Sequence, residues 1–478
     1  MSPRASLFAL VIPFVLAACA FEPRHVAQPG PVAAASLGLA SEPAPPVPER
    51  WWQSFGDPHL DALVAQATRD NPSLGEALAR LERARAEAVA AGSARAPQLD
   101  ASAEVSRSRF SALYIVPPPY GGGTFWDGQV NLGLSYDLDL WGRQRARIRA
   151  TERYVDAREL DARAATLAIE GAVVGAYVEL DRRYAIEELA READDTRVRL
   201  AVLTRRRVAA GLDTGIDRRT ADSALPESRT DRAQASAAIE LGVHRLAALT
   251  GQGAGAYAGL GRPALNYGGA LPLPTVIPGD LLTRRLDVQA ALARVQAATA
   301  GEDAARLAAY PEINLKAFAG FAALSLKDLL SAPARTYGLG PGVRLPIFDG
   351  GLLRAQYREA GADLEAAVSQ YNSTVLDAVR EVADAITTVE ALGRELRNSD
   401  ERLALLTEAQ RLAGELFRAG LTNQLVVLEA EGRVIAARRT LVTTRALEAE
   451  ARIALVVALG GGAQPALATP PVSAKALP

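Results

Sequence analysis

Residues whose side chains could perform catalysis are few in this sequence, and they do not cluster. The three histidines, His25, His59 and His244, lie far apart and lack the spacing of metal ligands. HExxH, GxSxG and P-loop strings are absent from the sequence, and the glycine runs at 121–123 and 460–462 are not followed by the Lys and Ser/Thr of a phosphate-binding loop. The sequence therefore predicts a protein that is not an enzyme and that uses no metal and no cofactor.

Cys19 is the residue whose type and position do predict a chemical reaction, namely covalent lipidation. Arg4 and the apolar stretch from Leu7 to Leu16 are typical of a signal peptide, and the stretch is too short to span a bilayer. The string LAAC, which ends at Cys19, resembles a bacterial lipobox, and Cys19 is the only cysteine of the chain. Ordinary cleavage beside an incidental or buried thiol is the alternative. Ala20, rather than Asp, follows the cysteine, which favours transfer of the lipoprotein to the outer membrane.

The composition predicts packed helices and excludes a nucleic-acid binder that relies on an overall basic charge. Lys and Arg number 53 against 55 Asp and Glu, and the formal net charge is -2. Hydrophobic residues make up 49% of the chain and aromatics only 5%, with Ala, Leu and Val interleaved with Arg and Glu. Beyond the predicted signal peptide (1–18), no apolar run is long enough for a membrane-spanning helix, so a membrane crossing would need strands.

Four segments alternate apolar and polar residues in the way of half-buried strands, at 98–110, 129–140, 311–322 and 336–347. Their length suits tilted transmembrane strands, although the alternation alone fits a soluble sandwich equally well. The predicted export and lipidation, and the aromatic, Gly- and Pro-rich loops that the strand pairs enclose, favour the membrane. Four strands cannot close a barrel, and an open sheet edge is not tolerated in lipid, so we expect two or three copies to share one sheet.

The chain repeats its own pattern, with a first copy at 51–260 and a second at 261–460. Gly211 corresponds to Gly420, and the string LWG at 140–142 corresponds to IFDG at 347–350. The predicted order in each copy is helix, two strands, long helix, Gly turn and helix. A Pro/Ala-rich tether (19–50) precedes the repeats and a disordered tail (461–478) follows. The predicted long helices are 142–211 and 350–419, and the shorter ones are 58–93, 216–250, 281–308 and 424–459.

The sequence resembles the outer-membrane factor family, the TolC-like channels, and in particular the lipoprotein branch that serves RND-type tripartite efflux systems. The resemblance covers nearly the whole chain from Cys19. It is carried by LAAC at 16–19, WWQSFGDPHLDALVAQATRDNP at 51–72, YDLDLWGR at 136–143, LAALTG at 246–251, RRLDVQAA at 284–291, LPIFDGG at 345–351 and ALGGG at 458–462. One departure is Leu286, where the family often has Pro.

The resemblance implies a mainly α fold with membrane β-structure. Three copies would form a twelve-stranded β-barrel continued by a twelve-helix periplasmic α-barrel. The implied partners are two further copies, a periplasmic adaptor, an inner-membrane RND-type pump and outer-membrane lipid. The implied function is passive export of drugs or other small solutes. An exit duct of a type I protein secretion system remains the alternative within this fold, and a structural outer-membrane lipoprotein without transport is the alternative of another class.

The resemblance also implies that function concentrates at the tips, where each long helix turns back. The tip residues expected to contact the adaptor are Arg207, Gly211, Leu212 and Thr214 in the first turn and Arg418, Gly420, Leu421 and Thr422 in the second. Asp217 and Glu429 are the expected gate or lumen acids, because three-fold symmetry would make each a ring that favours cations. The simpler reading is that the glycines end helices, that Asp217 belongs to a cap and that Glu429 lies on a solvated face. Arg205, Arg206 and Arg418 are candidates for ion pairs with neighbouring helices.

Overall fold

The computed structural model describes residues 37–40, 43, 45–113, 115, 117–257, 260–268 and 273–462. The predicted signal peptide, the lipidation residue Cys19, most of the predicted tether and the predicted tail beyond residue 462 lie outside the described residues. The chain divides into two compact units. Described residues of the first unit come from Arg80–Arg158 and Ala291–Tyr371, and those of the second come from Val32–Ala79, Glu159–Ala290 and Asn372–Pro478.

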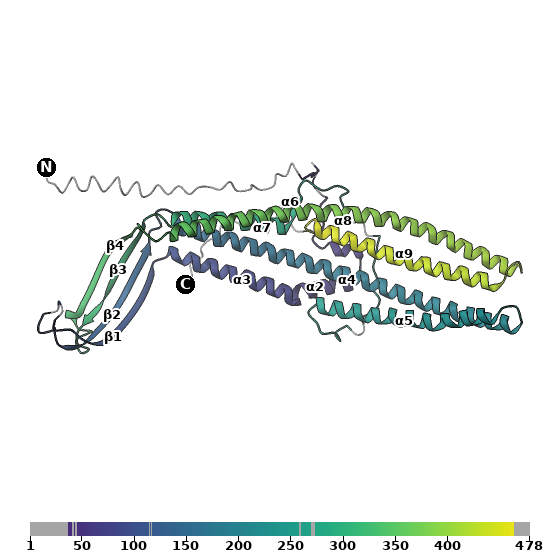
Figure 1. Ribbon diagram of the computed structural model, residues 1–478, viewed down its shortest axis with the longest axis horizontal. Coiled ribbons are helices and arrows are strands. Elements are labelled where there is room, and N and C mark those ends of the chain that lie inside the picture. The colour runs from purple at the N-terminus through teal and green to yellow at the C-terminus, as the bar shows by residue number, and fades with distance from the viewer. Residues whose placement is uncertain are drawn as a thin grey trace. The chain divides into compact units, whose positions relative to one another are not determined.

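The first unit contains an antiparallel sheet whose strands follow one another in the order β1-β2-β3-β4 (Figure 1). The strands are Gln98–Arg109 (β1), Thr124–Asp137 (β2), Glu312–Ala323 (β3) and Arg335–Arg344 (β4). β2 pairs with β3 although the helices between residues 143 and 307 separate them in sequence. β1 and β4 are the edges, and within the described part of the chain each is paired on one side only.

One face of this sheet is apolar and the other is polar. Residues that are directly paired across neighbouring strands point to the same face, so the register identifies the members of each face. One row across the strands reads Leu99, Leu134, Ala317 and Leu339. The apolar face comprises Leu99, Ala101, Ala103, Val105, Val130, Leu132, Leu134, Tyr136, Ile313, Leu315, Ala317, Ala319, Phe321, Tyr337, Leu339, Pro341 and Val343. The polar face comprises Gln98, Asp100, Ser102, Glu104, Asp127, Gln129, Asn131, Gly133, Ser135, Asp137, Glu312, Asn314, Lys316, Phe318, Gly320, Gly338, Gly340, Gly342 and Arg344. Leu132 is 53% exposed and Leu339 76%, so one chain leaves its apolar face uncovered.

The strand ends differ from those that the alternation predicts. β2 begins at Thr124 instead of residue 129 and ends at Asp137 instead of 140, and β4 ends at Arg344 instead of 347. After β2 the chain turns at Asp139, whose φ is 40°. The Asp139 carboxylate accepts hydrogen bonds from the backbone N–H groups of Gln144 (2.8 Å) and Arg145 (3.0 Å). This carboxylate caps the following helix, so residue 140 belongs to a turn, and Leu138 lies just beyond the strand with its N–H still donating to the Ile313 carbonyl (3.1 Å).

The helices come in matched pairs. The long helices α4 (Arg143–Ala209) and α8 (Leu352–Arg418) each have 67 residues, which makes each about 100 Å long. The helices that return from them, α5 (Gly215–Leu249) and α9 (Gln424–Ala458), each have 35 residues. The remaining elements are η2 (Trp51–Phe55), α2 (Pro58–Asp70), α3 (Pro72–Gly92), η3 (Ser93–Arg95), α6 (Leu281–Arg284), α7 (Leu286–Leu307) and η4 (Ala332–Ala334). Among the described residues, no helix is both long and apolar enough to cross a membrane.

Two predicted helices, 58–93 and 281–308, are each broken by one extended residue. Asn71 (φ -69°, ψ 124°) separates α2 from α3, because the residue before a proline avoids helical geometry. The Asn71 amide donates to the Leu249 carbonyl (2.7 Å), and its oxygen accepts from the Ser73 N–H (2.9 Å). Arg285 (φ -71°, ψ 121°) likewise separates α6 from α7, although Leu286 and not a proline follows it. Both breaks lie in the second unit.

The core of the second unit surrounds a buried hydrogen-bond network. Trp51 and Tyr177 are each 1% exposed and belong to the same apolar cluster. The Tyr177 hydroxyl donates to the Asp57 carboxylate (2.8 Å), which also accepts from the Ala264 N–H (2.8 Å) and caps α2 through the His59 N–H (2.9 Å). Burial alone would raise the pKa of Asp57, but these hydrogen bonds lower it below its ordinary value. The network ties the segment before α2 to α4.

Candidate functional site

The first tip is the turn from α4 to α5, and its glycine ends the long helix. Gly211 has a φ of 73°, a left-handed conformation that glycine adopts without strain. Its N–H donates to the Val208 carbonyl (3.0 Å), and the Leu212 N–H donates to the Arg207 carbonyl (2.9 Å). This pattern is a Schellman motif, which satisfies the last carbonyls of α4. Leu212 itself is 67% exposed.

The returning helix α5 begins with a capping box formed by Thr214 and Asp217. The Asp217 N–H donates to the Thr214 hydroxyl oxygen (3.3 Å), and the Thr214 N–H donates to the Asp217 carboxylate (2.8 Å). The hydrogen bond from the Thr214 hydroxyl (2.6 Å), followed by that from its backbone N–H, lowers the pKa of Asp217. Asp217 therefore has a structural role at the helix start, and its side chain is exposed.

Two ion pairs brace the first tip. Arg207 makes a two-pronged contact with Asp213, from Nε to Oδ2 at 2.7 Å and from Nη2 to Oδ1 at 2.8 Å. Sequence reasoning missed this partner, although the turn places Asp213 directly opposite the last turn of α4. Arg205 pairs with Asp222 of α5 at 2.7 Å, so this arginine does bridge to a neighbouring helix. Both pairs are internal to one hairpin and hold its geometry.

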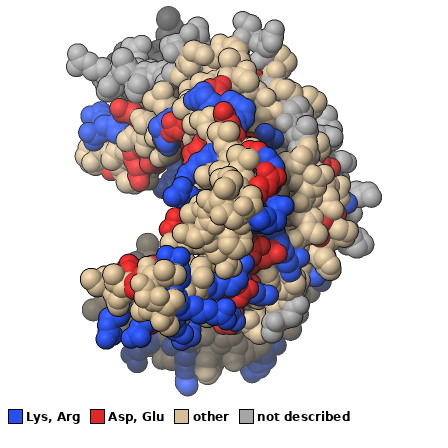
Figure 2. All heavy atoms as spheres, turned by 90° about the vertical axis from the view of Figure 1, so that its right-hand side faces the viewer, with Lys and Arg blue, Asp and Glu red and all other residues tan. Residues whose placement is uncertain are grey.

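The second tip, from α8 to α9, repeats the design with a different cap. Gly420 has a φ of 74° and donates its N–H to the Phe417 carbonyl (3.0 Å), while the Leu421 N–H donates to the Leu416 carbonyl (2.9 Å). Asn423 caps α9 by accepting from the Val426 N–H (3.3 Å). Leu421 is 75% exposed, Arg418 is exposed and Thr422 is half-buried. Each tip therefore presents one exposed leucine directly after its glycine. Figure 2 looks onto this end of the second unit and shows acidic and basic side chains interleaved over it.

Glu429 lies apart from the capping residues. It is exposed on α9 and lines a groove of about 320 Å³ between α4 and α9, together with Arg197 and Asp231. Among the described residues, no hydrogen bond or ion pair joins it to Asp217. The two acids therefore remain separate candidates within one chain.

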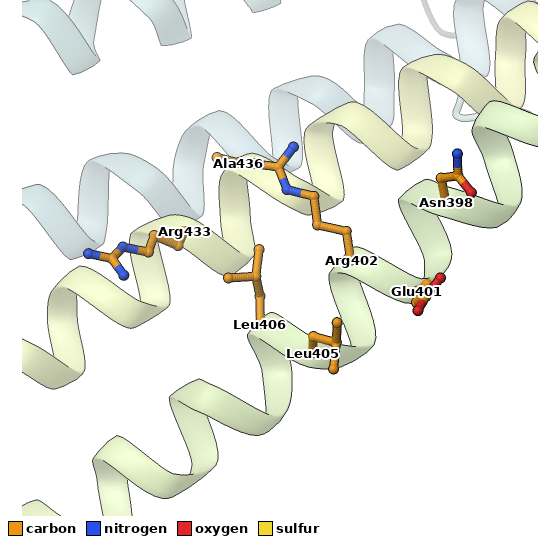
Figure 3. A pocket seen from close by; sticks show the side chains of 7 residues that line it. All are labelled: Asn398, Glu401, Arg402, Leu405, Leu406, Arg433 and Ala436. Atoms are coloured by element: carbon orange, nitrogen blue, oxygen red, sulfur yellow. The ribbon is translucent and has the colours of Figure 1, made fainter.

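Ion pairs between α4 and α9 fasten the two hairpins side by side. Arg199 pairs with Glu431, which also accepts from the Thr196 hydroxyl (3.0 Å), and Arg438 pairs with Glu192 at 3.2 Å. On the other side of α9, a groove of about 450 Å³ separates it from α8. Figure 3 shows Arg402 of α8 reaching across this groove towards Ala436. Sequence reasoning found none of these contacts, because they join residues far apart in the chain.

Two further charged groups in the second unit were also missed. Arg285 is 9% exposed and donates to Asp287 (2.9 and 2.6 Å), to Glu381 of α8 (2.8 Å) and to the Ala458 carbonyl of α9 (3.1 Å). On α4, burial and secondarily the nearby charge of Glu49 raise the pKa of Glu170 to about 7. Glu170 and Glu49 line the same cavity of about 440 Å³.

The paired hairpins, the repeated turns and the open sheet are those of a subunit of an outer-membrane channel. The sequence profile of the outer membrane efflux protein family matches residues 63–252 and 277–461, once for each repeat. The chain therefore belongs to this family. The family resemblance, the mainly α fold with its strands and internal repeat, and the function of an outer-membrane efflux channel are thereby confirmed.

Three related proteins support this assignment. The chain is 39% identical over 318 residues to the fusaric acid resistance protein FusA of Burkholderia cepacia, an alignment that covers 65% of this chain and 59% of FusA. It is 29% identical to the multidrug resistance outer membrane protein MdtP of Escherichia coli, over 87% of this chain and 86% of MdtP. The crystal structure of the outer membrane protein VceC of Vibrio cholerae superposes with a TM-score of 0.79 at 32% identity, over 87% of this chain and 99% of VceC.

Proposed function

We propose that three copies of this chain form the passive outer-membrane conduit of a tripartite efflux system. The observation that carries this proposal is the four-stranded sheet with an exposed apolar face. Within the described residues its edges, β1 and β4, each lack a second neighbour. Unpaired backbone groups cost several kcal/mol each in lipid, so copies of the chain must complete the sheet.

The side chains of the polar face favour three copies over two. An eight-stranded barrel, from two copies, has an interior just wide enough for its own side chains to fill. The polar face of this sheet is instead rich in glycine, with Gly133, Gly320, Gly338, Gly340 and Gly342. Small side chains on the inner wall of a twelve-stranded barrel leave a water-filled lumen, which a solute channel needs.

The tips are the proposed contact with a periplasmic adaptor. Leu212 and Leu421 are exposed apolar side chains held on turns that capping and glycine geometry make rigid. Such preorganised anchors lower the entropic cost of binding. The neighbouring contact residues are Arg207, Gly211, Thr214, Arg418, Gly420 and Thr422, and Asp217 and Glu429 are the proposed acids of the gate or lumen.

The adaptor contact is tested with Leu212→Glu and Leu421→Glu combined. Chemical cross-linking in cells followed by purification of the channel should recover much less adaptor with this variant than with wild type. The matched control is Leu113→Glu, because Leu113 is 98% exposed in the loop between β1 and β2. Equal recovery of adaptor by all three proteins would remove the tips from the interface.

Cys19 is the proposed site of lipid attachment and anchors the chain in the outer membrane. Cells that express wild type and are labelled with radioactive palmitate should yield a labelled channel. The variant Cys19→Ala should yield an unlabelled one. Label that persists in the variant would contradict the assignment.

The transported solutes are proposed to be drugs or other small molecules, and an inner-membrane RND-type pump is proposed to supply the energy. The names of FusA and MdtP support this class of cargo. Deletion of the gene should lower resistance in a panel of drugs, metals and solvents and leave secreted proteins unchanged. Unchanged resistance with a missing secreted protein would indicate a type I secretion duct. A purified trimer without conductance in a planar bilayer would indicate a structural lipoprotein.

A further inference from the structure

Three arginines lie on the side of the sheet that is otherwise apolar. Arg107 is opposite Trp126, Arg109 is opposite Thr124 and Arg335 is opposite Phe321, so all three point to the side of the apolar face. No carboxylate of the four strands lies on that side. The three side chains are exposed, and none of them forms an ion pair with another described residue. This side therefore carries uncompensated positive charge.

The polar face of the sheet carries more acidic than basic side chains. On the polar face, Lys316 and Arg344 stand among five acids, which are Asp100, Glu104, Asp127, Asp137 and Glu312. Arg344 lies directly opposite Glu312 across the β3–β4 pair. A general excess of arginine in the strands therefore does not explain the three on the apolar side.

The arginines occupy one end of the sheet, next to the loops that join β1 to β2 and β3 to β4. The apolar residues of β3 run from Ile313 to Phe321, which at about 3.4 Å per residue and a tilt of about 40° covers roughly 20 Å of membrane thickness. Arg335 lies level with the end of this band, and Arg107 lies beyond it. Two exposed aromatic side chains lie at this end of the sheet: Trp126, opposite Arg107 and 42% exposed, and Tyr337, opposite Ala319 near the end of the band and 84% exposed. Aromatic side chains of this kind collect at the boundary between hydrocarbon and headgroups.

The guanidinium groups of these arginines suit a phosphate ligand. The Arg107 guanidinium lies 5.4 Å from the centre of the Trp126 ring, so stacking helps to fix its orientation, and no described residue forms an ion pair with it. A guanidinium matches the oxygens of a phosphate through two parallel hydrogen bonds. A lipid-facing arginine is costly at the centre of a bilayer and tolerated at headgroup depth.

We propose that Arg107, Arg109 and Arg335 bind the phosphate groups of lipids in the outer leaflet of the outer membrane. The inference rests on the proposed function, which turns the apolar face towards lipid and the loop end towards the cell exterior. Arg107 and Arg109 stand on the edge strand β1 and Arg335 on the edge strand β4. Closure of three copies joins β4 of one copy to β1 of the next, so a bound phosphate bridges two copies and stabilises the trimer.

The test uses the full-length trimer, purified in detergent and incubated with diphosphorylated lipid A or with lipid A from which both phosphates have been removed. Native mass spectrometry measures lipid retention, and heating measures the midpoint of trimer dissociation. Wild type should retain the phosphorylated lipid at least about tenfold more tightly, because each basic residue adds to the attraction of an anionic lipid. The same lipid should raise the dissociation midpoint of the trimer.

Variants locate the binding site. Arg107→Gln, Arg109→Gln and Arg335→Gln combined should abolish the preference for phosphate. Arg335→Gln alone should weaken it, whereas the matched control Lys316→Gln, which removes one charge from the polar face, should leave it unchanged. Equal binding of both lipids by wild type would overturn the proposal, even if the triple variant failed to assemble. Conductance in a planar bilayer distinguishes failure of the proposed channel function from failure of the lipid site. Absence of conductance in wild type would refute the channel. Conductance together with equal binding of both lipids would refute only the lipid site.

Discussion

Arg285 joins three elements of the second unit, and its replacement by methionine is the perturbation with the largest expected effect. The side chain is 9% exposed at the break between α6 and α7. It contacts Asp287 beside the break, Glu381 of α8 and the Ala458 carbonyl at the end of α9. Methionine keeps the unbranched stem of the side chain, so Arg285→Met removes the guanidinium with its charge and its donors and leaves the apolar stem in place.

The expected loss follows from the exposure of the partners. Removal of one member of a buried ion pair typically costs about 3–5 kcal/mol, because the other charge is left buried. Asp287 and Glu381 retain 42% and 44% of their side-chain exposure, so water can solvate both once Arg285 is gone. We therefore expect a loss of about 2–3 kcal/mol at pH 7, below the range for a fully buried pair. Arg285→Lys keeps the charge without the fork of donors and should lose less.

The assay is thermal unfolding of the purified protein in detergent, followed by circular dichroism at one fixed heating rate because unfolding of such a protein can be irreversible. Arg285→Met should unfold a few degrees below wild type at pH 7. Burial alone would raise the pKa of Asp287, but the hydrogen bonds and the charge of Arg285 hold it below its ordinary value. A lowered pKa stabilises the fold above the pKa of the unfolded chain, and this stabilisation is lost as pH falls through the folded value. The gap between wild type and Arg285→Met should therefore narrow on acidification to about pH 3.

Two results would refute this reasoning. One is an Arg285→Met protein as stable as wild type at pH 7, which would mean that hydration of the two acids fully replaces the arginine. The other is a stability gap that stays constant as the pH falls, which would assign the loss to packing instead of charge. Asp287→Asn serves as the control, because it should reproduce part of the loss at pH 7 and show a weaker dependence on acid.

Three further outcomes are expected. The pKa of Glu170 is raised to about 7, so its contribution to stability is present in acid and is lost as pH rises through 7. Glu170→Gln should therefore unfold at a higher temperature than wild type at pH 8 and at the same temperature at pH 4. A difference in unfolding temperature that is equal at both pH values would contradict this prediction. Gly211→Ala and Gly420→Ala should each destabilise a tip by about 1–2 kcal/mol, because both positions have left-handed φ. A deletion strain complemented with either variant should show reduced resistance. Full resistance would indicate that the turns tolerate the strain. Glu429→Gln and Asp217→Asn should each lower the preference for cations in the reversal potential of a planar-bilayer channel, and an unchanged potential would remove that acid from the lumen.

Much of the local structure could be predicted from the sequence, because local patterns determine it. Alternation of apolar and polar residues predicted both faces of the sheet. Gly211 and Gly420 were found as helix-ending residues since glycine is favoured where φ is positive. The Thr214–Asp217 capping box was readable from its spacing of three residues. Errors arose where one residue acts on its neighbours, as at Asp139, which ends β2 early, and at Asn71 and Arg285, which break predicted helices.

The sequence alone determined the repeat, because similar strings recur at a fixed offset along the chain. It also determined the strand faces and the chemistry of the turns, because these depend on residues within a few positions of one another. Only the tertiary structure decided the pairing of β2 with β3, the union of Arg285 with Ala458, 173 residues away, and that of Asp57 with Tyr177, 120 residues away. Such contacts depend on how whole helices pack, and a single charged residue in a helix carries no mark of its distant partner. The grouping of the three arginines was decided in the same way, since strand register places Arg107 and Arg335 on the same side of the sheet although the helices α4 to α7 separate them in the chain.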